Sequence, residues 1–137
     1  LLFNHDSIYR NEKFLIPKLV KSFIRKDKDY IEKIFCLNIS GDFSNAENIC
    51  YGIYKLSVSK KKIPKIILSS GKRFLINDII DFLIKKFPLK IDKNLKVSKN
   101  NYKHIGSNKL ARKLINYKNK GNFLNVVNQI LKKQIKN

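Results

Sequence analysis

Short apolar runs alternate along this chain with longer segments whose apolar residues recur at helical spacing. Amphipathic helices are predicted at 14–24, 76–87 and 123–131, because each segment places its apolar residues on one side of a helix. Residues 63–69 contain the run Ile66-Ile67-Leu68, which is typical of a parallel strand covered on both faces. This alternation of strands and helices predicts an α/β protein.

Two further strands are predicted, a buried one at residues 1–5 and another at 31–39. Ser44-Asn45-Ala46-Glu47 is a capping box that begins a helix, with the Ser44 hydroxyl accepting from the backbone N–H of Glu47. Ser107 is expected to cap one more short helix. We therefore expect two or three short strands with about five helices, a thin sheet that needs strands from another part of the polypeptide.

The chain is strongly basic, with 30 Lys and Arg against 10 Asp and Glu and a net charge of +20. Such a charge suits a polyanionic partner, for example nucleic acid, an anionic membrane or nucleotide phosphates. A/T-rich coding bias is the interpretation that we favour, because Lys far outnumbers Arg and Ile and Asn are abundant. The lysines are also spread over the whole chain instead of forming one tract.

Length and composition limit the remaining classes of protein. A chain of 137 residues can bury a core, and no apolar run approaches the roughly 20 residues of a membrane span. Cys36 and Cys50 fit neither a disulfide framework nor a zinc site, and Cys50 is predicted to be a buried thiol. Reduced cysteines favour a cytoplasmic location. The chain has no Met and begins at Leu1 in mid-pattern, so we interpret it as a fragment without a signal peptide.

Four segments in order carry a resemblance to a known family: Leu2-Phe3-Asn4-His5-Asp6-Ser7 with Arg10, Glu12 and Phe14; residues 41–49; residues 66–80; and residues 106–112 with Asn116-Tyr117-Lys118. Together they resemble the extended short-chain dehydrogenase/reductases, the NAD-dependent epimerase/dehydratase family. The first segment is similar to the LFNHES…RxE…F motif of GDP-mannose 4,6-dehydratases. The resemblance covers nearly all of the chain.

The resemblance implies that residues 1–137 are the C-terminal, substrate-binding portion of an extended Rossmann-type enzyme whose cofactor-binding half is missing. The complete enzyme would be a nucleotide-sugar 4,6-dehydratase or an epimerase that uses NADP or NAD. In the dehydratase, a hydride would leave C4 of the sugar, water would be lost across C5–C6, and the hydride would return at C6. The complete enzyme would be a cytoplasmic homo-oligomer, and this chain would hold the nucleotide-diphosphate end of its substrate.

Four substrate-binding residues follow from the resemblance. Asn4 matches a strand-end Asn that contacts the nucleotide sugar, and an amide can both donate and accept. Lys18 matches a Lys near the diphosphate, at the start of a helix where backbone N–H groups already favour anions. Arg10 matches a family position in the loop, and Lys96 stands in the segment that holds the nucleotide. The alternatives are a turn-forming Asn4, a solvated Lys18 and an Arg10 that only orders its loop.

The chain also departs from the family in ways that limit its chemistry. Gly41 replaces an Arg that contacts the nucleotide, and Lys96 lacks the planar fork of an Arg, so the nucleotide base is not predicted. No Gly-x-x-Gly-x-x-Gly loop follows a strand, so no cofactor-binding residue is predicted. His5 is expected to be structural, and neither His has a partner at metal-ligand spacing, so no metal site is predicted.

No catalytic residue is predicted either. The family uses a Tyr-x-x-x-Lys pair, and Tyr9/Lys13 and Tyr51/Lys55 have that spacing. Both pairs come after the Leu-Phe-Asn-His segment, whereas the family's pair precedes it, so we attribute them to chance in a lysine-rich chain. The chain is therefore expected to be inactive alone.

Two other interpretations stay open. One is a small basic nucleic-acid-binding protein with aromatic residues beside lysines, as at Tyr117-Lys118, although no nucleic-acid-binding motif is present. The other is a remnant without a present function. A nucleic-acid partner or a membrane partner is not expected, and a nucleotide-diphosphate sugar is.

Overall fold

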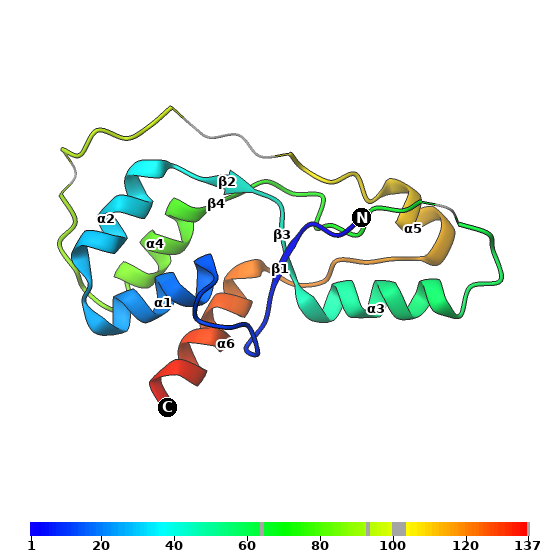
Figure 1. Ribbon diagram of the computed structural model, residues 1–137, viewed down its shortest axis with the longest axis horizontal. Helices are drawn as coiled ribbons and strands as arrows, with labels where there is room; N and C mark the ends of the chain where they lie inside the picture. The colour runs from blue at the N-terminus through cyan, green and yellow to red at the C-terminus, as the bar shows by residue number, and fades with distance from the viewer. Residues whose placement is uncertain (64, 93, 100–103, 137) are drawn as a thin grey trace.

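The computed structural model describes residues 1–63, 65–92, 94–99 and 104–136 (Figure 1). Its helices are α1 (Leu15–Arg25), α2 (Lys28–Leu37), α3 (Ala46–Ser57), α4 (Ile76–Ile84), α5 (Lys109–Ile115) and α6 (Phe123–Lys136). Its strands are β1 (Asn4–Asp6), β2 (Ser40–Gly41), β3 (Phe43–Asn45) and β4 (Phe74–Leu75). The chain is the small α/β protein that the alternating pattern predicts.

The molecule is elongated and has two lobes joined at the strands (Figure 1). Helices α1, α2, α4 and α6 form one end, which we call the helical lobe. Helices α3 and α5, with residues 65–71 and 104–120 around them, form the other end, which we call the small lobe. No helix among the described residues is long and apolar enough to cross a membrane.

The strands are very short and pair in two separate sheets. β1 lies parallel to β3, with Asn4 opposite Phe43, and β2 lies antiparallel to β4. Beyond β1, a single parallel bridge joins Leu2 to Leu68, which is the only β pairing of the predicted strand 63–69 within the described residues. The predicted strand at 1–5 is shifted to 4–6, and it is not buried at its start, where Leu1 and Leu2 are 70% and 51% exposed.

The prediction of a strand at 31–39 is wrong, because these residues belong mainly to the helix α2. The sequence did not predict this helix. The Asp27 side chain caps this helix by accepting from the backbone N–H of Tyr30 at 3.1 Å. Ile31 and Ile34 are its buried residues, a helical spacing of three. Asn38 ends it in the left-handed conformation, with φ of 45°.

The predicted N-cap at Ser44 is also wrong, although the helix predicted to follow it is present as α3. Ser44 lies in β3, is 1% exposed, and its hydroxyl has no hydrogen-bond partner among the described residues. Asn45 is the N-cap of α3 instead, and its side-chain oxygen accepts from the backbone N–H of Glu47 at 3.0 Å. For the helix predicted after Ser107, the N-cap is Asn108 and no side chain caps the backbone.

The helical lobe has a core built from the three helices with the strongest apolar faces. Helices α1, α4 and α6 each contribute residues that are almost fully buried: Ile16, Leu19, Val20, Phe23, Ile76, Ile79, Ile80, Leu83, Val126, Val127 and Ile130. These helices are confirmed close to their predicted bounds, and α4 ends at Ile84 with a final turn before Pro88. Pro17 lies in the first turn of α1, where its missing N–H removes no helical hydrogen bond.

The small lobe has its own, smaller core, in which Tyr117 is central. The buried side chains of this core are Ile49, Ile66, Leu68, Ala111, Ile115 and Tyr117. Helix α3 turns only Ile49 and Gly52 fully inward. Cys50 is therefore exposed and not the buried thiol that was predicted, and the neighbouring Ile53 and Tyr54 are 46% and 58% exposed.

Substituting Gly52 with Ala tests the packing of this small core. A Cβ at Gly52 would lie 2.9 Å from two ring carbons of Tyr117 and 3.0 Å from a methyl carbon of Leu68. Helix propensity alone would make the change stabilising by about 1 kcal/mol. Because the ring is fully buried and would have to shift to admit the Cβ, we expect Gly52→Ala to lower the free energy of unfolding by about 1–3 kcal/mol. A rise in the urea midpoint would contradict this packing.

Two further substitutions, with one control, test the start of α3. Because the buried Ser44 hydroxyl has no partner, Ser44→Ala should leave the thermal midpoint unchanged or raise it. Asn45→Ala should cost about 1 kcal/mol as a lost N-cap. Ser69→Ala is the control for burial, because the equally buried Ser69 hydroxyl donates to the Gly106 carbonyl at 2.9 Å. A large fall in the thermal midpoint on Ser44→Ala would instead indicate that the Ser44 hydroxyl caps α3.

Candidate functional site

A small polar hollow lies where β1 ends, beside the start of α1. It has a volume of about 190 Å³ and is lined by Asn4, His5, Asp6, Arg10, Phe14, Leu15, Ile39 and Phe43. We call it the Asn4 hollow. The strand brings Asn4 and Asp6 to it, and the following loop returns Arg10 and Phe14. Two of the four predicted substrate-binding residues, Asn4 and Arg10, therefore line the same hollow.

A loose ion pair shapes the electrostatics of the Asn4 hollow. The Arg10 Nε lies 3.7 Å from Asp6 Oδ1, which is too long for a hydrogen bond, and neither atom has a hydrogen-bond partner among the described residues. The guanidinium instead lies over the Phe14 ring, 3.6 Å from its centroid. Burial raises the pKa of Asp6 to about 6, and the charges of Arg10 and His5 offset only part of this rise.

The other two predicted residues lie outside the Asn4 hollow. Lys18 is exposed on α1, and its ammonium lies 4.5 Å from the ring centroid of Tyr30. Lys96 is exposed in the segment 94–99, which is tied to the end of α2 because the Ser98 N–H donates to the Cys36 carbonyl at 2.8 Å. The structure therefore brings Asn4 and Arg10 together, with Lys18 and Lys96 at separate positions.

Asp42 is buried next to Gly41, and its surroundings give it a structural role. Its carboxylate accepts hydrogen bonds from the Ser70 N–H at 2.8 Å, the Ser70 hydroxyl at 2.6 Å, the Gly71 N–H at 2.9 Å and the Gly106 N–H at 3.1 Å. Gly41, which stands where the family has an Arg, is buried in β2. Burial, helped by the charge of Asp42, raises the pKa of Tyr117 to about 12.

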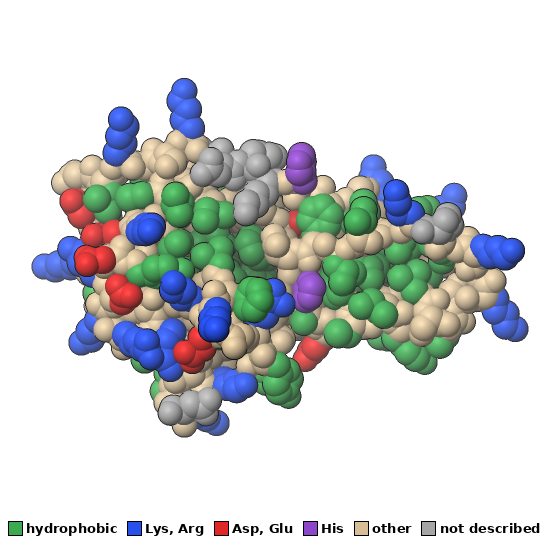
Figure 2. Space-filling model, viewed as in Figure 1, with side chains coloured by type: hydrophobic (Ala, Val, Ile, Leu, Met, Phe, Trp, Pro, Cys, Tyr) green, Lys and Arg blue, Asp and Glu red, His purple; other side chains and the backbone are tan. Residues whose placement is uncertain are grey.

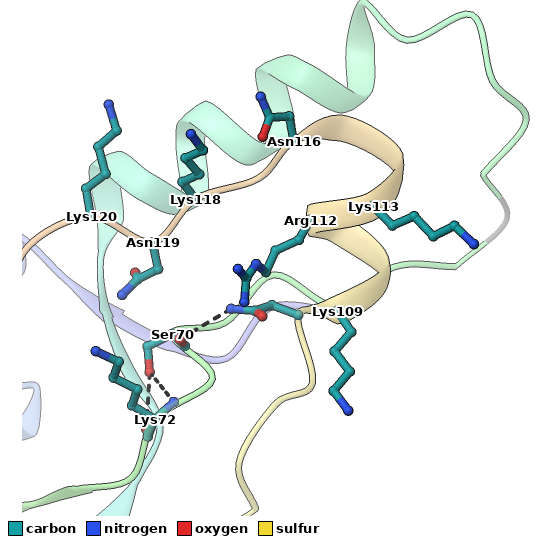
Figure 3. A pocket seen from close by; sticks show the side chains of 10 residues that line it. Ser70, Lys72, Lys109, Arg112, Lys113, Asn116, Lys118, Asn119 and Lys120 are labelled. Atoms are coloured by element: carbon teal, nitrogen blue, oxygen red, sulfur yellow. Dashed lines mark hydrogen bonds between the residues drawn. The ribbon is translucent and has the colours of Figure 1, made fainter.

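A second and much larger hollow lies in the small lobe. It has a volume of about 770 Å³ and is lined by Ser70, Lys72, Asn108, Lys109, Arg112, Lys113, Asn116, Lys118, Asn119 and Lys120 (Figure 3). We call it the basic hollow. The positions of the lysines do not predict it, because they are spread over the whole chain. The signal was the distribution of acids: residues 93–137 contain twelve Lys and Arg and no Asp or Glu.

Neither a glycine-rich cofactor loop in the sequence nor a metal-ligand cluster among the described residues is present. The chain's five glycines stand at positions 41, 52, 71, 106 and 121, so no glycine-rich phosphate loop can form. Tyr51 and Lys55 lie on the exposed side of α3, with the ammonium 5.4 Å from the ring centroid. Within the described ranges, no three His, Cys, Asp or Glu side chains gather closely enough to hold a metal ion.

Comparison with solved structures shows which known fold this chain shares. No protein-family model matches the chain, and a search of the curated proteins finds no match. Among solved structures, the chain is similar to RMD from Pseudomonas aeruginosa, solved with NADPH, at a TM-score of 0.72 and 15% identity over 96% of this chain and 45% of that one. It has the fold of the C-terminal portion of the extended short-chain dehydrogenase/reductases.

Two other enzymes of this fold give the same match. A UDP-glucuronic acid 4-epimerase from Bacillus cereus, solved with UDP-glucuronic acid and NAD, matches at a TM-score of 0.75 and 16% identity over 98% of this chain and 44% of that one. WbmG from Bordetella bronchiseptica, solved with NAD and UDP, matches at a TM-score of 0.73 and 16% identity. The match covers 98% of this chain and 43% of that one. The chain thus spans less than half the length of these extended short-chain dehydrogenase/reductase structures.

Asp6 should make the stability of the protein depend on pH. Its pKa rises from 3.8 to about 6 on folding, so the ionised carboxylate destabilises the folded state above about pH 6, and this cost disappears below about pH 4. We expect Asp6→Asn to raise the thermal midpoint by roughly 3–8 °C at pH 7.5 and to change it little at pH 4. Asp81→Asn, at an exposed position of α4, is the control. A difference that does not vary with pH would contradict the burial of Asp6.

Proposed function

We propose that residues 1–137 form the substrate-binding part of a nucleotide-sugar dehydratase or epimerase, whose NAD- or NADP-binding half lies on polypeptide outside this chain. The observation that carries the proposal is the match of 98% of this chain to 44% of a UDP-glucuronic acid 4-epimerase solved with its nucleotide sugar and NAD. The Asn4 hollow supports it, because it presents polar groups at a strand end.

Unpaired backbone groups near the N-terminus and exposed apolar side chains support the existence of the cofactor-binding half. The Phe3 N–H donates to the Leu68 carbonyl, and the Leu68 N–H donates to the Leu1 carbonyl. This pattern directs the N–H and carbonyl of Leu2 to the opposite edge, where a further strand could pair. Large apolar side chains that are between 46% and 70% exposed are Leu1, Leu2, the α3 residues Tyr51, Ile53 and Tyr54, and Val58 directly after α3. A half that adds strands and covers these side chains would remove this exposure.

The groups of the Asn4 hollow suit a diphosphate or a sugar. The Asn4 amide can donate to a phosphate oxygen and accept from a sugar hydroxyl. The Arg10 guanidinium, held against Phe14, offers planar donors to a phosphate. A hollow of about 190 Å³ is too small for a whole nucleotide sugar, so it would be one wall of a larger pocket. Lys18 and Lys96 would contact more distant parts of the same ligand.

The substrate and reaction are proposed from two sources. The Leu2-to-Ser7 segment favours GDP-mannose and 4,6-dehydration. The solved structures with UDP-glucuronic acid and UDP favour a UDP-sugar and epimerisation. Because this chain has no glycine-rich phosphate loop, the cofactor of the redox step would be held by the other half.

The test uses the product of the complete reading frame that contains residues 1–137. We expect it to bind NAD or NADP and to convert GDP-mannose or a UDP-sugar, followed by ¹H NMR of the sugar protons. Loss of water at C6 identifies a dehydratase, and inversion at a ring carbon identifies an epimerase. A reading frame without a cofactor-binding half, or a product that binds no nucleotide sugar, would refute the proposal.

Asn4→Ala should weaken binding of the nucleotide sugar in that protein. Removing an amide that contacts the ligand should cost about 1.4 kcal/mol, which is a tenfold rise in Kd. Lys33→Ala, at an exposed position of α2, is the control and should leave Kd unchanged. Calorimetric titration measures both, and equal Kd values for the wild type and Asn4→Ala would remove Asn4 from the site.

A further inference from the structure

We propose that the basic hollow of the small lobe is a binding site for an oligophosphate group, a chain of two or three linked phosphates. Six of its lining residues are Lys or Arg, none is Asp or Glu, and the remaining four are Ser or Asn. It shares no lining residue with the Asn4 hollow, so the proposal does not depend on the proposed function.

Two cations from different segments lie on opposite sides of the hollow. Figure 3 shows Arg112 reaching in from α5, and Lys72 extending from the turn after Ser70 toward the side on which Asn119 lies. Lys109, Lys113, Lys118 and Lys120 project outward from its rim in the same view. A linear phosphate chain matches this arrangement, because its charges are spaced along a line and can contact cations on both sides of the hollow at once.

The inward groups stand on a framework that hydrogen bonds fix in place. The turn that carries Lys72 is held by Asp42, and the Asn108 amide donates to the Ser69 and Ser70 carbonyls at 3.2 and 3.3 Å. On the other side, the Asn48 amide donates to Asn119 Oδ1 at 3.1 Å and to the Lys120 carbonyl at 2.9 Å. Because Asn119 uses its oxygen in this way, its amide N–H groups remain available to a phosphate oxygen.

The charges of the basic hollow are not balanced by neighbouring acids. None of its six cations pairs with a carboxylate of the described residues, whereas in the helical lobe Lys21 pairs with Glu12 at 3.2 Å and Lys28 with Glu32 at 3.4 Å. Figure 2 shows the same contrast on one face, with acidic side chains mainly over the helical lobe. Coding bias raises the number of lysines everywhere but does not explain why acids are missing from residues 48–77 and 93–137. Unpaired cations around a concave surface concentrate anions there.

The shape and lining of the hollow select the class of ligand. A volume of about 770 Å³ lies within the range of small-molecule sites. A single-stranded nucleic acid needs a long basic groove with aromatic side chains for its bases, and this lining contains no aromatic residue. The recognised element is therefore the phosphate chain itself, whether inorganic or part of a nucleotide.

The experiment titrates inorganic tripolyphosphate into the product of the complete reading frame at low ionic strength. We expect Lys72→Gln combined with Arg112→Gln to raise Kd at least tenfold. The charge-matched control is Lys33→Gln combined with Lys85→Gln, two exposed positions of the helical lobe, which should change Kd less than twofold. Equal losses in both variants would mean attraction by net charge alone and would overturn the proposal, as would an unchanged Kd in the first variant.

A second variant keeps the test valid if the double substitution disturbs folding. Asn119→Asp preserves the oxygen that accepts from Asn48 but replaces the free amide donor with a negative charge. We expect it to abolish tripolyphosphate binding while Asn4→Ala leaves that binding unchanged. Loss of tripolyphosphate binding in Asn4→Ala would also overturn the site. So would random single-stranded DNA that competes with tripolyphosphate equally well in the wild type and in the variant with Lys72→Gln and Arg112→Gln. The nucleotide-sugar assay reports separately on the proposed function.

Discussion

The carboxylate of Asp42 is the interaction on which the junction of the two lobes depends. It is fully buried, lies between β2 and β3, and accepts from Ser70, Gly71 and Gly106, residues from two distant parts of the chain. Four donors compensate a charge that would otherwise be costly to bury. The same contacts place the turn after Ser70 beside the segment that leads into α5. Ser70 and Lys72 on one segment and Asn108 on the other line the basic hollow, so this buried acid fixes one side of it.

Helices could be predicted well from the sequence where their apolar spacing was strong, and strands could not. Helices α1, α4 and α6 match their predicted segments because each buries a continuous apolar side. In α2 the buried residues are Ile31 and Ile34 only, so the apolar pattern was short enough to be interpreted as a strand. The strands themselves have two or three residues, too few for any period to show. The exposure of Cys50 depends on which side of α3 packs against Tyr117. This is a tertiary contact that the local sequence does not determine.

The candidate site was only partly accessible to sequence reasoning. Asn4 and Arg10 are close in the chain, and a strand followed by a loop brings them to one hollow. Lys18 and Lys96 depended on a resemblance, and their distance from that hollow follows from the packing of α1 and of the segment held against α2. The basic hollow gathers residues 70–72 and 108–120, which local patterns cannot place together. Its only linear trace is the absence of acids after Asp92.

The close contact between Gly52 and Tyr117 has an evolutionary consequence. The ring occupies the space that a side chain at position 52 would need, so a change at one position affects what the other tolerates. A descendant that gains a larger residue at position 52 would be less stable unless it also carried a smaller residue at 117. These two positions should therefore covary among homologues, although one lies on a helix and the other beyond the end of a different helix.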